Sequence, residues 1–312
     1  TLSPSQAAAF HDVVVEHKSI LITGVAGSGK SHVLRTILSH LPKDSTFVTG
    51  STGVAALNVG GTTIHSFAGI GTGQGDISKL VHKATKNSAC RKRWKKCEVL
   101  IIDEISMVND TILDVLDQIG RKAKGRPNEP FGGIQVICCG DFLQLPPVTG
   151  SYCFDSPIWG SMGMKVHMLS GNFRHSGDAV FQDMLWRIRI GDLDDELLWK
   201  LNRRNPRHPK FVKTANKNVQ AVVLRPTRNE VATINRRKFD ALHPVSNSSH
   251  DLPANIVIRH LQSHVAPFAK AKADDFWFKP KMKAMMDAHR FRGPVSLSLK
   301  VGTQVMLQRN IA

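Results

Sequence analysis

Residues 24–31 (GVAGSGKS) constrain the fold of this chain more than any other stretch. They fit the phosphate-loop pattern G-x-x-x-x-G-K-[ST], which requires a strand before it and a helix after it. The apolar run at 20–22 predicts a buried strand, and residues 31–41 carry five aliphatic side chains at helical spacing. The glycines allow backbone N–H groups to point at a polyphosphate, and the helix adds its positive N-terminal end. The stretch therefore predicts a nucleoside triphosphate site.

Two residues of this loop have specific expected roles. The Lys30 ammonium is expected to reach the β- and γ-phosphates, and the Ser31 hydroxyl to ligate Mg²⁺. The nucleotide is expected to lie against the whole loop, that is Gly24, Val25, Ala26, Gly27, Ser28, Gly29, Lys30 and Ser31. The alternative is a glycine-rich turn that matches the pattern by chance, and the suitable flanks argue against it.

Short apolar runs alternate with helical patterns over the first part of the chain. These runs cover residues 19–23, 46–49, 98–102, 135–139 and 165–169. Such alternation predicts an α/β fold with a parallel sheet that helices cover on both faces. Ligands of these sheets bind at the carboxyl ends of the strands. Residues 24–31, 103–104 and 140–141 all follow predicted strands, so we expect them to form one site.

Polar side chains with suitable chemistry follow two of these strands. Asp103 is expected to hold Mg²⁺, and Glu104 to polarise the water that attacks the γ-phosphate; a solvated helix cap is the alternative for the pair. Gln144 could hydrogen-bond the γ-phosphate or the attacking water, as a glutamine does in other nucleotide hydrolases. These residues predict a hydrolysis site rather than a binding site alone.

The net charge of +17 is distributed unevenly along the chain. Residues 1–200 carry 21 Lys and Arg against 19 Asp and Glu, whereas residues 201–312 carry 21 against six. Basic surfaces of this kind bind polyanions, because contacts with phosphates release counterions. A solubilising surface or a disordered tail is the alternative. No apolar run approaches ~18 residues, so we expect no membrane partner.

Five sequence blocks occur in an order that resembles a known family. They are GVAGSGKS, STGVAALNVGGTTIHSFAGIG (51–71), IIDEISM (101–107), GGIQVICCGDFLQLPPV (132–148) and LSGNFRHS (169–176). Together they resemble the petite-integration-frequency (PIF) family of DNA helicases, in superfamily one and related to RecD-type enzymes. Residues 224–235 and 299–312 are similar to the second motor domain of that family.

The resemblance implies a domain organisation. Residues 1–177 would form a RecA-like P-loop NTPase domain with a parallel sheet, and residues 178–210 a helical segment and linker. Residues 211–312 would form part of a second, strongly basic RecA-like domain. The family's closing motifs are not present before Ala312. We therefore expect an incomplete second domain, and slow ATP hydrolysis by residues 1–312 alone.

The resemblance also implies roles for residues around ATP and Mg²⁺. Gln6 matches the glutamine that reads the adenine edge, and Gln144 matches the γ-phosphate sensor. Arg174 matches an arginine that reaches the γ-phosphate as charge develops in the transition state. A surface salt bridge is the alternative role of Arg174.

Other residues match blocks that touch the DNA strand in the family. They are Thr52, Thr63, His65 and Phe67. Hydroxyls and imidazole suit contacts with phosphates and sugars, and Phe67 could stack on a base or belong to the core. Residues 91–96 and 276–281 combine basic and aromatic side chains, so they either bind nucleic acid or form solvated basic surface.

Three functions compete at this stage. The leading one, implied by the resemblance, is an ATP-dependent DNA helicase that translocates on single-stranded DNA, usually 5′-to-3′, in genome maintenance. It would act on single-stranded and forked DNA in the mitochondrion or nucleus. The second is a catalytically weak helicase-fold protein that binds DNA or RNA as an assembly factor. A small-molecule kinase is the third, and nothing in the sequence indicates its acceptor pocket.

Overall fold

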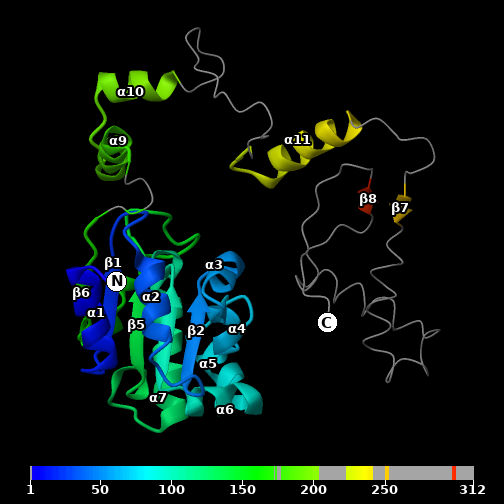
Figure 1. Cartoon of the computed structure of the whole chain (residues 1–312). Coiled ribbons are helices and arrows are strands. Elements are labelled where there is room, and N and C mark those ends of the chain that lie inside the picture. Colours follow the sequence, from blue (N-terminus) through cyan, green and yellow to red (C-terminus); the bar gives the residue numbers. More distant parts are fainter. Residues whose placement is uncertain are drawn as a thin grey trace, which may run out of the picture. The chain divides into compact units, whose positions relative to one another are not determined.

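The structure is a computed structural model, which describes residues 2–171, 173, 177–203, 223–241, 250–252 and 297–299 (Figure 1). The chain divides into two compact units, Thr1–Val212 and Lys213–Ala312. The first unit is an α/β domain built on a six-stranded parallel sheet, as predicted. In the described part of the second unit there are one helix and an antiparallel pair of strands.

The sheet of the first unit has the strand order β3-β2-β4-β5-β1-β6. Its strands are β1 (Ile20–Thr23), β2 (Thr46–Gly50), β3 (Thr62–Thr63), β4 (Val99–Asp103), β5 (Gln135–Cys139) and β6 (Lys165–Met168). Five of them coincide with the predicted apolar runs. The edge strand β3 was not predicted, because two residues are too few to show the alternation of a strand.

The helices of the first unit precede, connect or follow these parallel strands. They are α1 (Pro4–Val14), α2 (Lys30–Leu38), α3 (Gly53–Asn58), α4 (Ile64–Ala68), α5 (Ile77–Lys86), α6 (Ser88–Lys96), α7 (Asp110–Lys124), α8 (Pro157–Ser161), α9 (Ala179–Ile190) and α10 (Asp195–Asn202). Single 3-10 turns occur at Ile105–Met107, Pro130–Gly132 and Cys153–Asp155. Helix α2 confirms the helix predicted after the phosphate loop, although it ends at Leu38 and not at residue 41.

Two hydrophobic clusters cover the two faces of this sheet. On one face, α1 and α2 pack against alternate strand residues such as Ile20, Ile22 and Ile101. On the other face, α4 to α7 pack against the intervening residues, such as Leu100 and Ile102. Both faces of the central strands are therefore apolar, as expected for a buried parallel sheet. The polar site can then form only beyond the strand ends.

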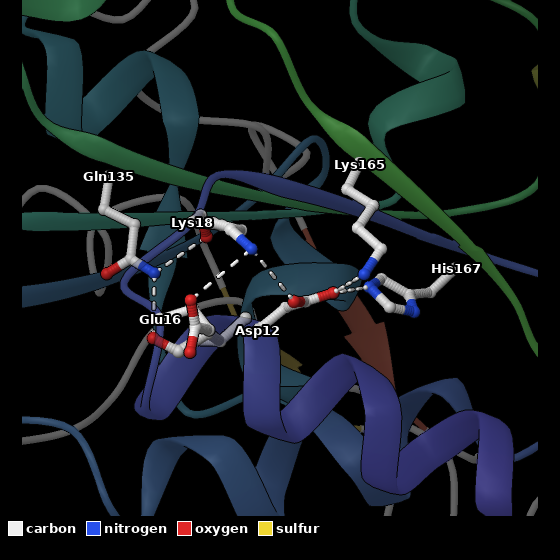
Figure 2. A network of polar contacts seen from close by, with 7 residues as sticks. Asp12, Glu16, Lys18, Gln135, Lys165 and His167 are labelled. Carbon is white, nitrogen blue, oxygen red and sulfur yellow. Dashed lines mark hydrogen bonds and ion pairs between the residues drawn. The ribbon is translucent and has the colours of Figure 1, made fainter.

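A polar network ties α1 to the edge strand β6 (Figure 2). The carboxylate of Asp12 lies 2.6 Å from Lys165 Nζ and 2.7 Å from His167 Nε2, both on β6. Lys18 lies 3.7 Å from the same carboxylate. At the start of β5, Gln135 Nε2 donates hydrogen bonds to the carbonyl oxygens of Val13 and Lys18. These contacts fix the position of α1, whose first turn faces the phosphate loop.

We expect Asp12→Asn to destabilise the first unit. The Asp12 side chain is 6% exposed, and an asparagine would leave Lys165 and His167 without their anion. The free energy of unfolding should fall by about 1.5–3 kcal/mol, the range for a hydrogen bond to a charged group. Thermal unfolding of both proteins measures the loss. Asp44→Asn is the control, since Asp44 is 97% exposed and 3.8 Å from its partner Lys96.

The pH dependence of this difference follows from the pKa of Asp12. The hydrogen bond from Lys165 is the largest effect that lowers this pKa below its usual 3.8, against the opposing effect of burial. A lowered pKa stabilises the fold fully above pH 3.8, and the stabilisation is lost as the pH falls further. The difference in Tm between the wild type and Asp12→Asn should therefore be largest at neutral pH and shrink as the pH falls below 3.8. Equal Tm values at neutral pH would show that the network contributes nothing.

The described residues of the second unit form α11 (Arg228–Asp240) and the antiparallel strands β7 (His250–Leu252) and β8 (Leu297–Leu299). Helix α11 is capped by Thr227, whose hydroxyl accepts a hydrogen bond from the backbone N–H of Glu230. Val223 and Leu224 lie in irregular backbone. Most of the expected linker and residues 276–281 lie outside the described residues. The boundaries at residues 177 and 210 remain predictions.

Within the described residues, no helix is both long and apolar enough to cross a bilayer.

Candidate nucleotide site

The loops that follow β1, β4 and β5 meet at the carboxyl edge of the sheet. Pairing of Ile22 and Asp103 with Cys139 of β5 brings the three strand ends level with one another. Gly140 donates its N–H to the carbonyl oxygen of Ile22, and a Cβ at Gly140 would come within 3.0 Å of Ile105. The sheet register therefore assembles the phosphate loop, the acidic pair and residues 140–144 into one site.

The phosphate loop uses backbone conformations that only glycine adopts without strain. Gly24, Gly27 and Gly29 have φ values of 149°, 88° and 87°. A Cβ at Gly24 would come 2.8 Å from the carbonyl oxygen of Leu169 and 2.8 Å from Ser28 Oγ. Ser28 Oγ is buried and has no hydrogen-bond partner among the described atoms. A loop with this shape and an unpaired hydroxyl fits an incoming phosphate group.

The Lys30 side chain folds back onto the phosphate loop. Its Nζ donates hydrogen bonds to the carbonyl oxygens of Gly24 at 2.7 Å and Val25 at 3.1 Å. These carbonyls are neutral acceptors, and a polyphosphate oxygen would bind the ammonium more strongly. The Lys30 charge also lies close enough to Asp103 and Glu104 to lower both of their pKa values against other effects. Lys30 therefore interacts with both the phosphate loop and the acidic pair.

Gln6 lies against the outer side of the loop, on the first turn of α1. It forms a capping box with Ser3, in which each side chain accepts a hydrogen bond from the backbone N–H of the other residue. Its Nε2 donates to the carbonyl oxygen of Ser28 at 3.4 Å. Gln6 is 2% exposed, so its amide orientation is fixed. The predicted adenine-reading residue is thus next to the loop, and its role remains a prediction.

We expect Gly29→Ala to weaken nucleotide binding. A Cβ at Gly29 would come 2.4 Å from Gln6 Nε2, and the φ of 87° adds strain. A loss of about 1.4 kcal/mol of binding free energy, caused by displacing the Gln6 side chain, corresponds to a tenfold increase in the Kd for the nucleotide. Titration with a fluorescent ATP analogue measures this change.

Gly125→Ala is the matched control for this substitution. Gly125 has a φ of 70°, but a Cβ there meets nothing within 4 Å. Both substitutions bear a left-handed strain of about 1–2 kcal/mol, but only Gly29 lies in the phosphate loop and would contact Gln6. Equal nucleotide affinities for the two variants would contradict the account.

The acidic pair lies directly beyond β4. Burial raises the pKa of Asp103, and it also raises the pKa of Glu104, to which the neighbouring Asp103 charge adds. Glu104 has a φ of 55°, a left-handed conformation that is uncommon for a residue with a side chain. Strain of this kind concentrates at functional sites, where the surrounding fold enforces it. A carboxylate with a raised pKa is a suitable general base near neutral pH.

The residues expected to ligate Mg²⁺ have the right chemistry. Ser31 offers a hydroxyl and Asp103 a carboxylate, the hard oxygen ligands that Mg²⁺ prefers. Among the described residues there is no group of three or more His, Cys, Asp or Glu that could hold a metal alone. Mg²⁺ commonly binds through one or two protein ligands together with substrate phosphates.

Gln144 lies in the loop that follows β5. Its Nε2 donates a hydrogen bond to Asp141 Oδ2 at 3.1 Å. Asp141 is buried and also accepts two hydrogen bonds from Arg189 of α9. This contact with Arg189 could not be predicted from the sequence, because the two residues are distant in the chain.

The block at 169–176 also approaches the phosphate loop. The backbone N–H of Phe173 donates to the carbonyl oxygen of Gly27 at 2.8 Å. Its ring lies 3.4 Å from where a Cβ of Gly29 would be. Phe173 was not predicted as a site residue. Arg174, which was predicted, lies outside the described residues.

Thr52, Thr63 and His65 lie at the ends of β2 and β3, on the same edge of the sheet. The Thr52 and Thr63 hydroxyls accept hydrogen bonds from the backbone N–H groups of Ala55 and Ser66, and thereby cap α3 and α4. Each hydroxyl keeps its own hydrogen for donation to a phosphate. Burial lowers the pKa of His65, which favours the neutral imidazole.

Phe67 belongs to the core. It is 2% exposed, and its ring centroid lies 5.2 Å from that of Phe47 and 4.8 Å from that of Trp94. No ring face is free to stack on a base, so the core alternative holds. Trp94 is fully buried as well, so its ring cannot stack on a nucleic-acid base.

Arg93 has a structural role within this basic stretch. Its guanidinium donates to the carbonyl oxygens of Ser66 and Phe67 at the end of α4. Cations at helix C-termini satisfy carbonyl groups that lack helical partners. The other cations of the stretch, Arg91, Lys92, Lys95 and Lys96, are exposed.

Comparisons with known proteins identify relatives of the chain. The family profile of PIF1-like helicases matches residues 1–197. The human ATP-dependent DNA helicase PIF1 is 36% identical over 318 residues, which cover 100% of this chain and 44% of that protein. The Saccharomyces cerevisiae protein of the same name is 37% identical over 306 residues, 94% of this chain and 32% of the relative. The chain thus spans less than half the length of these curated relatives.

Solved structures show the same likeness. The crystal structure of the Candida albicans Pif1 helicase superposes with a TM-score of 0.77 at 34% identity, over 99% of this chain and 65% of that one. A Bacteroides Pif1 helicase in complex with ADP-AlF3 and ssDNA has a TM-score of 0.67 at 29% identity, over 78% of this chain and 58% of that one. The fold, the phosphate-loop site and the family profile agree, and the chain belongs to the PIF1-like helicase family.

Proposed function

We propose that this protein is an ATP-dependent DNA helicase that translocates on single-stranded DNA in the 5′-to-3′ direction. One observation carries the proposal: the sheet brings the phosphate loop, the acidic pair and Gln144 together at one edge. These are the parts that nucleotide hydrolysis needs, namely a phosphate cradle, a base and a γ-phosphate contact. Membership of the family supports DNA as the nucleic acid on which the protein translocates.

Hydrolysis would use these residues in distinct roles. Lys30 would exchange its two carbonyl partners for the β- and γ-phosphates, while Gln6 would read the adenine edge. Glu104 would accept the proton of the attacking water, for which its raised pKa suits it. Bound Mg²⁺, held through Ser31 and Asp103, would supply positive charge beside the phosphates. Gln144 would contact the γ-phosphate, and Arg174 would stabilise its charge in the transition state.

The DNA strand would pass over the carboxyl ends of β2 and β3. Thr52 and Thr63 would donate their hydroxyl hydrogens to phosphates, and the neutral His65 would bond a phosphate or sugar without adding charge. Solved relatives are described as bound to ssDNA and as unwinding forked dsDNA. Such contacts to the backbone would hold the strand without reading its sequence.

A strand-displacement assay tests the proposal. Duplexes with a single 5′ tail or a single 3′ tail are mixed with the protein and Mg·ATP, and release of a labelled strand is followed. We expect release from the 5′-tailed duplex only, and none with Mg·ADP. Release without ATP, or from neither duplex while both bind, would contradict the proposed function. An RNA tail of the same sequence tests whether RNA serves as a second track.

We further infer that the protein works in genome maintenance in the nucleus or mitochondrion. The relatives from Homo sapiens and Saccharomyces cerevisiae are eukaryotic DNA helicases by name, which supports this placement. Imaging a fluorescent fusion of the full-length protein beside nuclear and mitochondrial DNA stains tests it. A signal outside both compartments would contradict it.

A further inference from the structure

The carboxylate of Asp141, directly after β5, lies in a dense network of donors. Its Oδ1 accepts hydrogen bonds from the Leu143 N–H at 3.2 Å and from Arg189 Nη2 at 2.8 Å. Its Oδ2 accepts from Arg189 Nε at 3.1 Å and from Gln144 Nε2 at 3.1 Å. Asp141 is only 1% exposed. Four donors therefore meet one buried carboxylate.

Arg189 reaches this carboxylate from the last turn of α9. Its side chain is 17% exposed, and its guanidinium also lies 5.3 Å from the centre of the Trp186 ring. Two parallel N–H···O bonds fix both the distance and the plane of an Arg–carboxylate pair. Burial by itself would raise the pKa of Asp141, but hydrogen bonds from Arg189 and Gln144 outweigh it and lower that pKa. Asp141 is thus held as an anion by its partners.

The anion in turn orients Gln144. An ionised carboxylate can only accept hydrogen bonds, so the amide nitrogen of Gln144, and not its oxygen, faces Asp141. One N–H of this nitrogen is used, and the second N–H and the amide oxygen remain for a phosphate and a water. The Gln144 side chain is otherwise exposed, so Asp141 restricts a side chain that would sample several rotamers.

We propose that Arg189 is a positioning residue: through Asp141 it holds the Gln144 amide in the orientation that reads the γ-phosphate, and so couples α9 to the nucleotide state. The inference rests on the proposed function, since it takes Gln144 as the γ-phosphate contact. Couplings between sites commonly change affinity by about 5–150-fold. We expect the loss of Arg189 to reduce discrimination between ATP-like and ADP-like states by about tenfold.

The experiment compares Arg189→Met with Arg187→Met, a control two positions earlier on the same helix. Arg187 pairs with Asp192 and Asp194, and neither contacts residues 141–144 in the described structure. The dissociation constant is measured for Mg·ADP and for Mg·ADP with aluminium fluoride, which mimics a γ-phosphate in transfer. Arg189→Met should leave the Kd of ADP unchanged and weaken binding of the aluminium fluoride complex about tenfold. Arg187→Met should change neither.

Two further variants separate positioning from folding. Arg189→Lys keeps the charge but loses the two-pronged geometry, so it should restore only part of the discrimination. Arg189→Met combined with Asp141→Asn removes both charges, so no uncompensated buried anion remains. This double variant should regain thermal stability relative to Arg189→Met, yet still fail to discriminate. If discrimination returned together with stability, Arg189 would be merely structural and the inference would be wrong.

Amide hydrogen exchange of α9 gives a second readout. In the wild type, exchange over residues 179–190 should differ between the ADP state and the aluminium fluoride state, and in Arg189→Met the difference should vanish. If the wild type discriminates and Arg189→Met does so equally, the inference fails while the proposed function stands. If the wild type binds neither nucleotide complex, the proposed function fails and the inference with it.

Discussion

Replacing Lys30 with alanine should abolish ATP turnover and weaken ATP binding. The Lys30 ammonium lies 2.7 Å from the Gly24 carbonyl oxygen, inside the loop that would hold the phosphates. No other lysine or arginine among the described residues hydrogen-bonds to this loop. Removal of one preorganised donor to a transition state typically costs about 10²–10³ in kcat. Steady-state release of phosphate in the presence of single-stranded DNA measures the effect.

The control for this variant is Lys43→Ala, because Lys43 is exposed and lies outside the phosphate loop. Its turnover should equal that of the wild type. Thermal unfolding should also give the same Tm for Lys30→Ala as for the wild type, since the lost contacts are two neutral carbonyl acceptors. Retention of most of the turnover by Lys30→Ala would mean that the loop does not position the reacting phosphate.

Replacing Glu104 with glutamine should stop hydrolysis and leave ATP binding intact. Glutamine has nearly the shape of glutamate, so the left-handed backbone at this residue is retained, but it cannot accept the proton of the attacking water. The loss of a general base costs about 10²–10⁴ in rate. Single-turnover hydrolysis together with ATP titration separates the two effects. Glu129→Gln, at an exposed glutamate, is the matched control.

The pH dependence of turnover gives a second test of Glu104. Burial and the Asp103 charge raise the pKa of Glu104 above its usual 4.5. A general base must be deprotonated, so turnover should fall as the pH drops through this raised value, which belongs to the coupled pair of carboxylates. We expect the acid limb of the pH profile to lie above 4.5 in the wild type. An acid limb at or below 4.5 would exclude Glu104 as the base.

The central part of the fold could be predicted because its signals are local. The strands β1, β4 and β5 are continuous apolar runs, and the phosphate loop carries its own glycine pattern. The start of α1 also follows from neighbouring residues, since Ser3 and Gln6 form a capping box across three positions. Each of these features depends on residues that are close in the sequence.

Composition did not indicate correctly the surroundings of two aromatic side chains, Trp94 and Phe67. Trp94 lies among basic residues, a composition that left nucleic-acid binding open for residues 91–96, yet its side chain is in the core. The signal for the correct answer was present: Cys90, Trp94 and Cys97 have the i, i+4, i+7 spacing of a buried helical stripe. Phe67 follows the same rule with Ile64 and Ala68, which are both fully buried.

The network around Asp141 could not be predicted from the sequence. Arg189 is one of two basic residues in the last turn of a helix, and nothing in its sequence neighbourhood indicates a carboxylate 48 positions earlier. The left-handed backbone of Glu104 was equally hidden, because nothing in the neighbouring sequence indicates a positive φ at this glutamate. Long-range pairing and strain depend on the completed fold.

The most direct test of the account is the rate of ATP hydrolysis with and without single-stranded DNA. The measurement compares the full-length wild type, Lys30→Ala and Glu104→Gln at saturating Mg·ATP. We expect DNA to raise wild-type turnover well above the DNA-free rate, and both variants to remain near background with or without DNA. Turnover by the wild type that does not respond to DNA, or variants that hydrolyse ATP as fast as the wild type, would contradict a DNA-driven motor built on this site.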